Sequence, residues 1–132
     1  WASENLVIKT TYTFSDLTAS AATQTFTIAL PAGHIIEFIK LKHSAAFTGG
    51  SLSSMTVRVA DTSGVADLIS AANVFQAPAE TRGTYVKGTA SATLIPNHDT
   101  STDVSVLFTG SHNVDTATAG SVTIWIKYIT LL

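Results

Sequence analysis

The 132-residue sequence contains no cysteine, only three prolines and a single methionine, and 12% of its residues are charged. The missing cysteine excludes a disulfide framework, a thiolate metal site and a thiol nucleophile. Soluble proteins typically carry roughly 25% charged residues. Threonine, serine and alanine take the place of the missing charges here. Stability must therefore come from a packed core, with contacts between subunits as a second source.

The charge balance and the hydrophobic pattern exclude further classes of protein. The net charge of −2 provides no sign of the basic stripe that a nucleic-acid-binding domain carries. No run of roughly 18 apolar residues occurs, so we expect no membrane span. The low charge favours an oligomer, because a monomer with so neutral a surface risks non-specific association. We therefore expect a homo-oligomer with neither a nucleic-acid nor a membrane partner.

The C-terminal stretch Ser121–Leu132 is the most informative part of the sequence. Its residues are β-branched or aromatic almost throughout, and they alternate with the period of two that is typical of a strand. One face of this strand contains Val122, Ile124, Ile126 and Tyr128. The opposite face is not polar either, because it contains Trp125, Ile129 and Leu131. A strand covered on both sides indicates the centre of a sheet, or a sheet packed against a neighbouring subunit.

Alternation elsewhere in the chain predicts further strands of similar length. They are expected at Leu6–Phe14, Gln24–Leu30, His34–Ser44, Ser54–Asp61, Tyr85–Ile95 and Asp103–Thr109. Glu37 interrupts the apolar face of the third of these strands, which indicates a β-bulge. Val65–Phe75 fits either a short helix or a brief strand followed by an irregular loop. Gln76–Arg82 contains Pro78 and is expected to be a loop.

This pattern predicts the fold class. About eight strands, with turn signals roughly every 8 to 14 residues, are typical of an antiparallel sandwich. We expect one all-β domain that spans residues 1–132, with jelly-roll-like topology and at most one short helix. Residues 1–4 precede the first expected strand and are interpreted as an N-terminal arm.

The histidines and the oxygen-rich loop do not form a recognisable metal site. None of the four histidines has the spacing of a local metal clip, and the HExxH motif is absent. His43 shares a strand face with Ile39 and Leu41, so we interpret it as a hydrogen-bonded histidine at a strand end or interface. The stretch Asn97–Asp103 is rich in oxygen ligands but lacks the glycine and the final glutamate of a calcium loop. We expect no metal ion.

Enzyme motifs are absent as well. No serine lies in a G-x-S-x-G elbow, and most acidic residues lie in or beside turns rather than as a pair on facing strands. Gly49 and Gly50 are not followed by the lysine of a phosphate-binding loop. We therefore expect a protein without enzymatic activity and without a cofactor. Trp1 and Trp125 remain candidates for sugar stacking, although packing or an interface is the favoured interpretation.

Four phrases of the sequence resemble those of the small structural (virion) proteins of tailed bacteriophages, a group that resembles capsid decoration proteins. They are Tyr12–Ala19, Ile39–Ser53, Leu68–Ala77 and Thr118–Val122. The resemblance extends over nearly the whole chain. It implies a non-enzymatic part of a virion, assembled in the host cytoplasm, and it carries no catalytic residues.

The resemblance suggests two roles. The first is a capsid decoration (cement) protein, a homotrimer that binds the major capsid protein or other virion proteins and stabilises the assembled shell by mass action. The alternative is a receptor- or glycan-binding module of a tail fibre or baseplate, which would use Trp125 or the loop Ser111–Thr118. For the first role, we expect the interface to contain Trp1, Phe38, Lys40, Trp125, Ile129 and Leu131.

Overall fold

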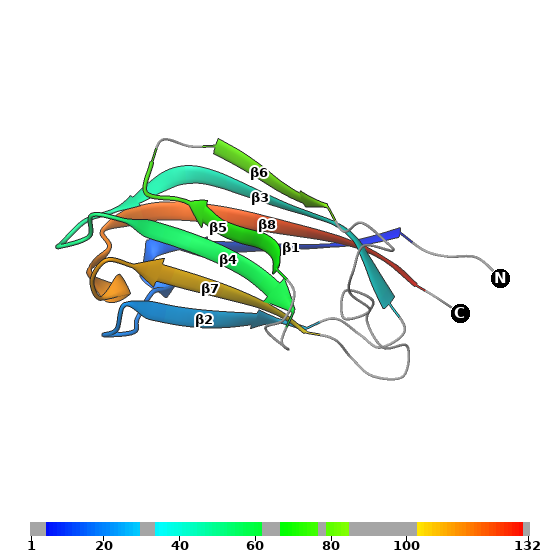
Figure 1. Cartoon of the computed structure of the whole chain (residues 1–132), viewed down its shortest axis with the longest axis horizontal. Coiled ribbons are helices and arrows are strands. Elements are labelled where there is room, and N and C mark those ends of the chain that lie inside the picture. Colours follow the sequence, from blue (N-terminus) through cyan, green and yellow to red (C-terminus); the bar gives the residue numbers. More distant parts are fainter. Residues whose placement is uncertain (1–4, 30–33, 62–66, 77–78, 85–102, 131–132) are drawn as a thin grey trace.

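The computed structural model describes residues 5–29, 34–61, 67–76, 79–84 and 103–130. These segments form two four-stranded antiparallel sheets that face each other across a core (Figure 1). The first sheet, called sheet A, has the order β1, β8, β3, β6. Its strands are β1 (Asn5–Thr13), β8 (Ala119–Thr130), β3 (His34–Thr48) and β6 (Ala79–Thr84).

The second sheet, called sheet B, has the order β2, β7, β4, β5. Its strands are β2 (Thr23–Ile28), β7 (Val104–Gly110), β4 (Met55–Asp61) and β5 (Asp67–Asn73). In the two sheets together the first strand pairs with the eighth, the second with the seventh, the third with the sixth and the fourth with the fifth. This wrapped pairing is that of a jelly roll, so the predicted all-β, jelly-roll-like sandwich is confirmed.

Helical structure in the described ranges is limited to two single turns, η1 (Phe14–Asp16) and η3 (Val114–Thr116). Neither is an α-helix, and no helix in these ranges has the length and apolar character that crossing a membrane requires.

Three details of the expected element boundaries differ from the structure or lie outside it. The segment left open between helix and strand contains strand β5, so the helical interpretation is wrong. The expected loop Gln76–Arg82 is also wrong, because it overlaps β6. The expected strand Tyr85–Ile95 lies outside the described residues. The bulge predicted at Glu37 is confirmed by a register shift between Ile36 and Phe38.

The core lies between the inward faces of the two sheets, as the alternation predicts. The inward residues Val122, Ile124 and Ile126 of β8 have no exposed surface. Phe108 of β7 lies at the centre of an aromatic cluster, with ring centroids 5.9 Å from Tyr12, 5.7 Å from Phe26 and 5.5 Å from Phe47. Such pairs contribute about 0.5–1.5 kcal/mol each beyond their area burial. The cluster therefore fastens β1 and β3 of sheet A to β2 and β7 of sheet B.

His43 is the exception in this core, because it is a polar side chain that is only 2% exposed. It shares an inward strand face with Ile39 and Leu41, as predicted, but it lies within β3 rather than at a strand end. Neither ring nitrogen forms a hydrogen bond with any group that the structure describes. Burial lowers the pKa of His43 below its ordinary value of 6.5, and the nearby backbone of Ala45 opposes this lowering in part. The folded protein therefore favours the neutral imidazole.

Gly120 occupies a position that only glycine suits. Its φ is +140°, and a Cβ atom there would overlap with the ring and the Cα of Phe47. We expect Gly120→Ala to lower the free energy of unfolding by about 2–4 kcal/mol, from overpacking and backbone strain together. Urea unfolding followed by circular dichroism measures this change. Thr123→Ala, on the outer face of the same strand, should cost less than about 1 kcal/mol. Equal losses in the two variants would contradict the assignment.

The buried His43 predicts a pH dependence of stability. Below pH of about 6.5 the unfolded chain binds a proton on this residue, whereas the folded chain resists protonation because the lowered pKa belongs to the folded state. Stability should therefore fall as the pH is lowered through and below this value. Urea midpoints measured at pH 7.5 and 5.0 should fall less in His43→Leu than in the wild type. His112→Gln, at an exposed histidine, should retain the full decrease.

Candidate functional site

The described part of the chain presents the outward faces of two sheets. Within it, no group of three or more histidine, cysteine and acidic residues is placed to hold a metal ion. The candidate site is therefore sought on the two outward faces of the sandwich, which differ in character.

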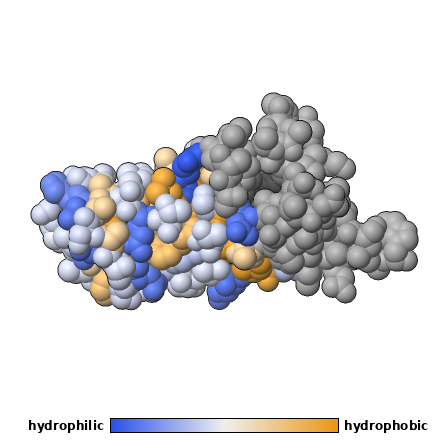
Figure 2. All heavy atoms as spheres, turned by 90° about the horizontal axis from the view of Figure 1, so that it is seen from below, coloured by the Kyte–Doolittle hydropathy of each residue, from blue (hydrophilic) through white to orange (hydrophobic). Residues whose placement is uncertain are grey.

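The outward face of sheet B is rich in hydroxyl groups and also contains Arg58 of β4. The register aligns Thr23, Thr109, Thr56 and Asn73 in one row across its four strands. Thr25 and Thr27 of β2 are also exposed. Figure 2 views the molecule from below, where white and blue spheres predominate and orange occurs in small separate groups. Such a surface is suited to contact with water.

The outward face of sheet A is organised around Trp125. This half-buried side chain lies on the central strand β8, and the register places Lys9 of β1 on one side and Lys40 of β3 on the other. The Nζ atom of Lys40 lies 5.2 Å from the centroid of the Trp125 ring, and the Nζ atom of Lys9 lies 5.7 Å from it. Both distances fall within the range of cation–π contacts. The expected cover over this side of β8 is therefore provided in part by two lysines of the same chain.

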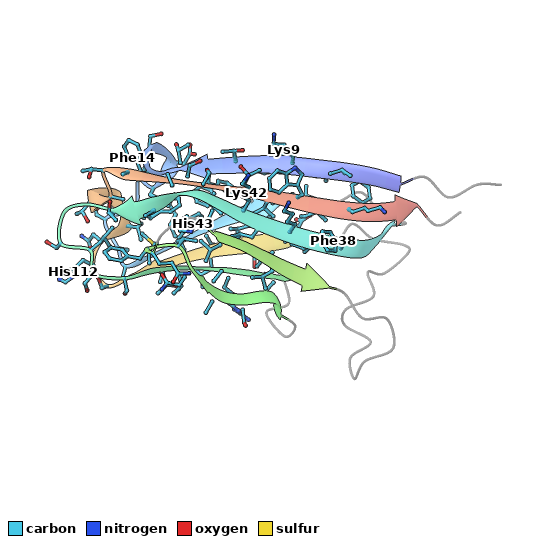
Figure 3. The ribbon with its side chains drawn as sticks, turned by 90° about the horizontal axis from the view of Figure 1, so that it is seen from above. Lys9, Phe14, Phe38, Lys42, His43 and His112 are labelled. Atoms are coloured by element: carbon cyan, nitrogen blue, oxygen red, sulfur yellow. The ribbon has the colours of Figure 1, made fainter. Side chains whose placement is uncertain are left out.

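Further basic and apolar side chains extend this surface. The next row of the register contains Val7, Lys127 and Phe38, and the row on the other side contains Lys42 opposite Thr123. Figure 3 looks onto sheet A from above, with Lys9 on β1 and with Phe38 and Lys42 on β3. We name this surface the Trp125 face. It consists of Val7, Lys9, Phe38, Lys40, Lys42, Trp125 and Lys127.

The Trp125 face is positively charged although the whole chain is not. It contains four of the seven lysine and arginine residues. Arg82 occupies the register position opposite Lys40, and Glu80 the position opposite Lys42. The acidic residues whose side chains the structure describes lie elsewhere, namely Asp16 in η1, Asp115 in η3 and Asp103 beside β7. The net charge of the whole chain therefore does not reveal this concentration of lysines on one face.

Of the six predicted interface residues, the structure brings three together. Phe38, Lys40 and Trp125 lie on the Trp125 face. The backbone of Ile129 pairs with Asn5 and Ile35 at the end of the same sheet, but its side chain lies outside the described part. Trp1 and Leu131 lie outside the described residues. Whether any of these residues contacts a partner stays a prediction.

Sequence reasoning missed most of the lysines on this face. Lys9, Lys42 and Lys127 each alternate with inward residues on their own strands, so their outward direction could be predicted from the sequence. Their proximity to one another follows from the order of the strands, which local alternation does not reveal.

The loop Ser111–Thr118, the alternative binding element, is held firmly at one end of the sandwich. The backbone N–H of Val114 donates to the carbonyl oxygen of Ala21 at 2.8 Å, and the Ser20 hydroxyl donates to the Asp115 carboxylate at 2.7 Å. Both connections join this loop to the segment between β1 and β2. The loop is therefore an ordered part of the fold rather than an independent binding arm.

The contact between Lys40 and Trp125 predicts a measurable coupling. A double-mutant cycle with Lys40→Met and Trp125→Leu should give about 0.5–1 kcal/mol of interaction free energy in urea unfolding. A second cycle, with Arg58→Met and Trp125→Leu, provides the control, because Arg58 lies in β4 of the other sheet. Its coupling should be near zero. Equal couplings in both cycles would show that the cation–π contact contributes nothing specific.

Comparison with known proteins places the fold but not a family. No model of a known protein family matches the sequence, and no curated protein matches it. The structure is similar to a chain in the capsid asymmetric unit of cyanophage Pam1, with a TM-score of 0.59 and 20% sequence identity. The likeness covers 97% of this chain and 86% of that chain. At this identity it shows a shared fold.

A second solved structure resembles the chain more weakly. A chain of infectious bursal disease virus, Gx strain, has a TM-score of 0.45 and 12% identity, and the likeness covers 98% of this chain but 32% of that chain. No functional or structural conclusion follows from a likeness at this level.

Proposed function

We propose that this chain is a non-enzymatic structural protein of a phage virion, and that it decorates the outside of the head as a cement protein. The observation that supports this most directly is the jelly roll itself, which a chain of a phage capsid unit shares over nearly the whole length. Jelly rolls are frequent in viral capsids, although lectins and enzymes use them too. The resemblance of the sequence to phage virion proteins supports the same role.

The difference between the two outward faces supports a decorating role. A protein seated on a shell needs one surface that binds the shell and another that remains in water. The Trp125 face combines aromatic, apolar and four basic groups, whereas the outward face of sheet B is rich in threonine and contains Arg58. We therefore propose that sheet A faces the shell and sheet B faces solvent, with the major capsid protein or a neighbouring virion protein as partner.

We retain the homotrimer as part of this proposal. In a cyclic trimer each copy contacts the next through two unlike surfaces. Two copies of the Trp125 face would place lysines against lysines, so a face-to-face dimer through this surface is disfavoured. A ring of three copies can use two unlike surfaces for its contacts and leave sheet A free for the shell. Such a ring does not place lysines against lysines.

The alternative role, a glycan-binding module of a tail fibre or baseplate, is less well supported by the geometry. A tryptophan that stacks on a sugar must present an open ring face. Lys9 and Lys40 reach the Trp125 ring from the strands on either side of it. The ring is therefore flanked by cations instead of forming an open platform.

Particle composition and binding test this proposal. In heads of the encoding phage, quantitative mass spectrometry should find on the order of hundreds of copies per particle, whereas a tail module would be present in a few to dozens. The purified protein should co-sediment with emptied heads and raise their melting temperature, because a ligand of the assembled state stabilises it. A low copy number together with binding to host cells would exclude the cement role.

A further inference from the structure

We propose that the Trp125 face docks an acidic segment of a partner protein in extended conformation, with carboxylates at every second residue. This inference rests on the proposed function, since it specifies the chemistry of the shell surface that the protein would contact. It concerns one face of the molecule and one class of partner.

The spacing of the lysines is the first step. Lys40 and Lys42 lie two residues apart on β3, so their outward positions are separated by roughly 7 Å, and strands are about 5 Å apart. Lys9 and Lys40 flank β8 and are therefore roughly 10 Å apart. An extended chain also presents alternate side chains roughly 7 Å apart on one side. Acidic residues at every second position would thus match the spacing of Lys40 and Lys42.

The apolar groups indicate a protein rather than a nucleic acid. Val7 is 59% exposed, and it shares a row with Lys127 and the half-buried Phe38. The aliphatic stem of a lysine adds apolar surface to such a row. These groups need apolar side chains from the partner, which a phosphate backbone does not supply.

The acidic side chains that the structure describes do not make a second copy of the chain a fitting partner. Two of its described acidic side chains already accept hydrogen bonds within their own chain. Asp16 accepts one from the backbone N–H of Thr13 at 2.8 Å, and Asp115 accepts one from Ser20 at 2.7 Å. Both lie in the turns η1 and η3 and not along one strand, so they do not reproduce the alternate spacing.

Titration of the isotope-labelled full chain locates the site directly. The probe is a synthetic peptide of eight residues with alternating glutamate and threonine, and the control peptide has glutamine in place of glutamate. Chemical-shift changes should occur in β1, β3 and β8 with the acidic peptide and be absent with the control. Changes confined to sheet B or to the η1 and η3 turns would refute the proposal. If a short DNA duplex bound to the Trp125 face more tightly than the acidic peptide, the proposed protein partner would be refuted in favour of a nucleic acid.

Charge-reversal variants test the face quantitatively. Lys42 is exposed, and Lys42→Glu should weaken peptide binding by about fivefold or more, because it changes the local charge by two units. Arg58→Glu makes the same change in β4 of sheet B and should alter binding by less than about twofold. Equal effects of the two variants would overturn the assignment. Unchanged thermal melting confirms that both variants remain folded.

Binding of the same variants to phage heads separates this inference from the proposed function. Heads that bind the wild type and Lys42→Glu equally would refute the docking face and leave the cement role intact. Heads that fail to bind the wild type would refute the cement role. The peptide titration would still show whether the Trp125 face binds an acidic segment. A clear loss of head binding in Lys42→Glu, but not in Arg58→Glu, would support both the docking face and the cement role.

Discussion

The rest of the structure depends on one constraint, the pairing of β8 with β1 and β3. In this pairing the side chains of β8 point alternately into the core and outward. Its inward residues form the centre of the core, and its outward residues hold Trp125 between Lys9 and Lys40. A slip of one residue would turn Trp125 and Lys127 into the core, and it would turn the buried valine and isoleucines outward. The same register that buries the core therefore also assembles the Trp125 face. Core and candidate site are two consequences of one pairing.

The jelly-roll wrapping makes this register depend on residues that are distant in the sequence. The first strand pairs with the last, so the chain must be nearly complete before sheet A can close. Without cysteine, packing must hold the two sheets together, and Phe108 does so through its contacts with aromatic rings from both sheets. Gly120 lets the start of β8 pass close to Phe47 where a larger residue would collide with it.

Local alternation was enough to predict the fold class, most strands and the central place of the last strand. It failed at β5 and β6, where mixed small and polar residues carry no clear period and a proline suggested a loop. Phe38, Lys40 and Trp125 were predicted from the composition of single strand faces, but the cluster of lysines was not. Its members come from three strands, and only the pairing brings them together. The direction of His43 was predictable as well. That His43 finds no hydrogen-bond partner among the described residues was not predictable, because this depends on what the surrounding strands provide.

The placement of the few charges explains how a partly exposed apolar and aromatic surface is compatible with so neutral a protein. A sheet face with a half-buried tryptophan, a half-buried phenylalanine and an exposed valine would favour stacking between copies if it were uncharged. Four lysines on this face make two copies repel each other, while a partner with carboxylates removes the repulsion and gains the apolar contact. Lysines are used in the same way to protect the edges of sheets against pairing. In this view the lysines select the partner mainly by excluding the protein's own copies. The low number of charges then matters less than the concentration of positive charge on one face. A positive charge spread over both sheets would not distinguish the two sides.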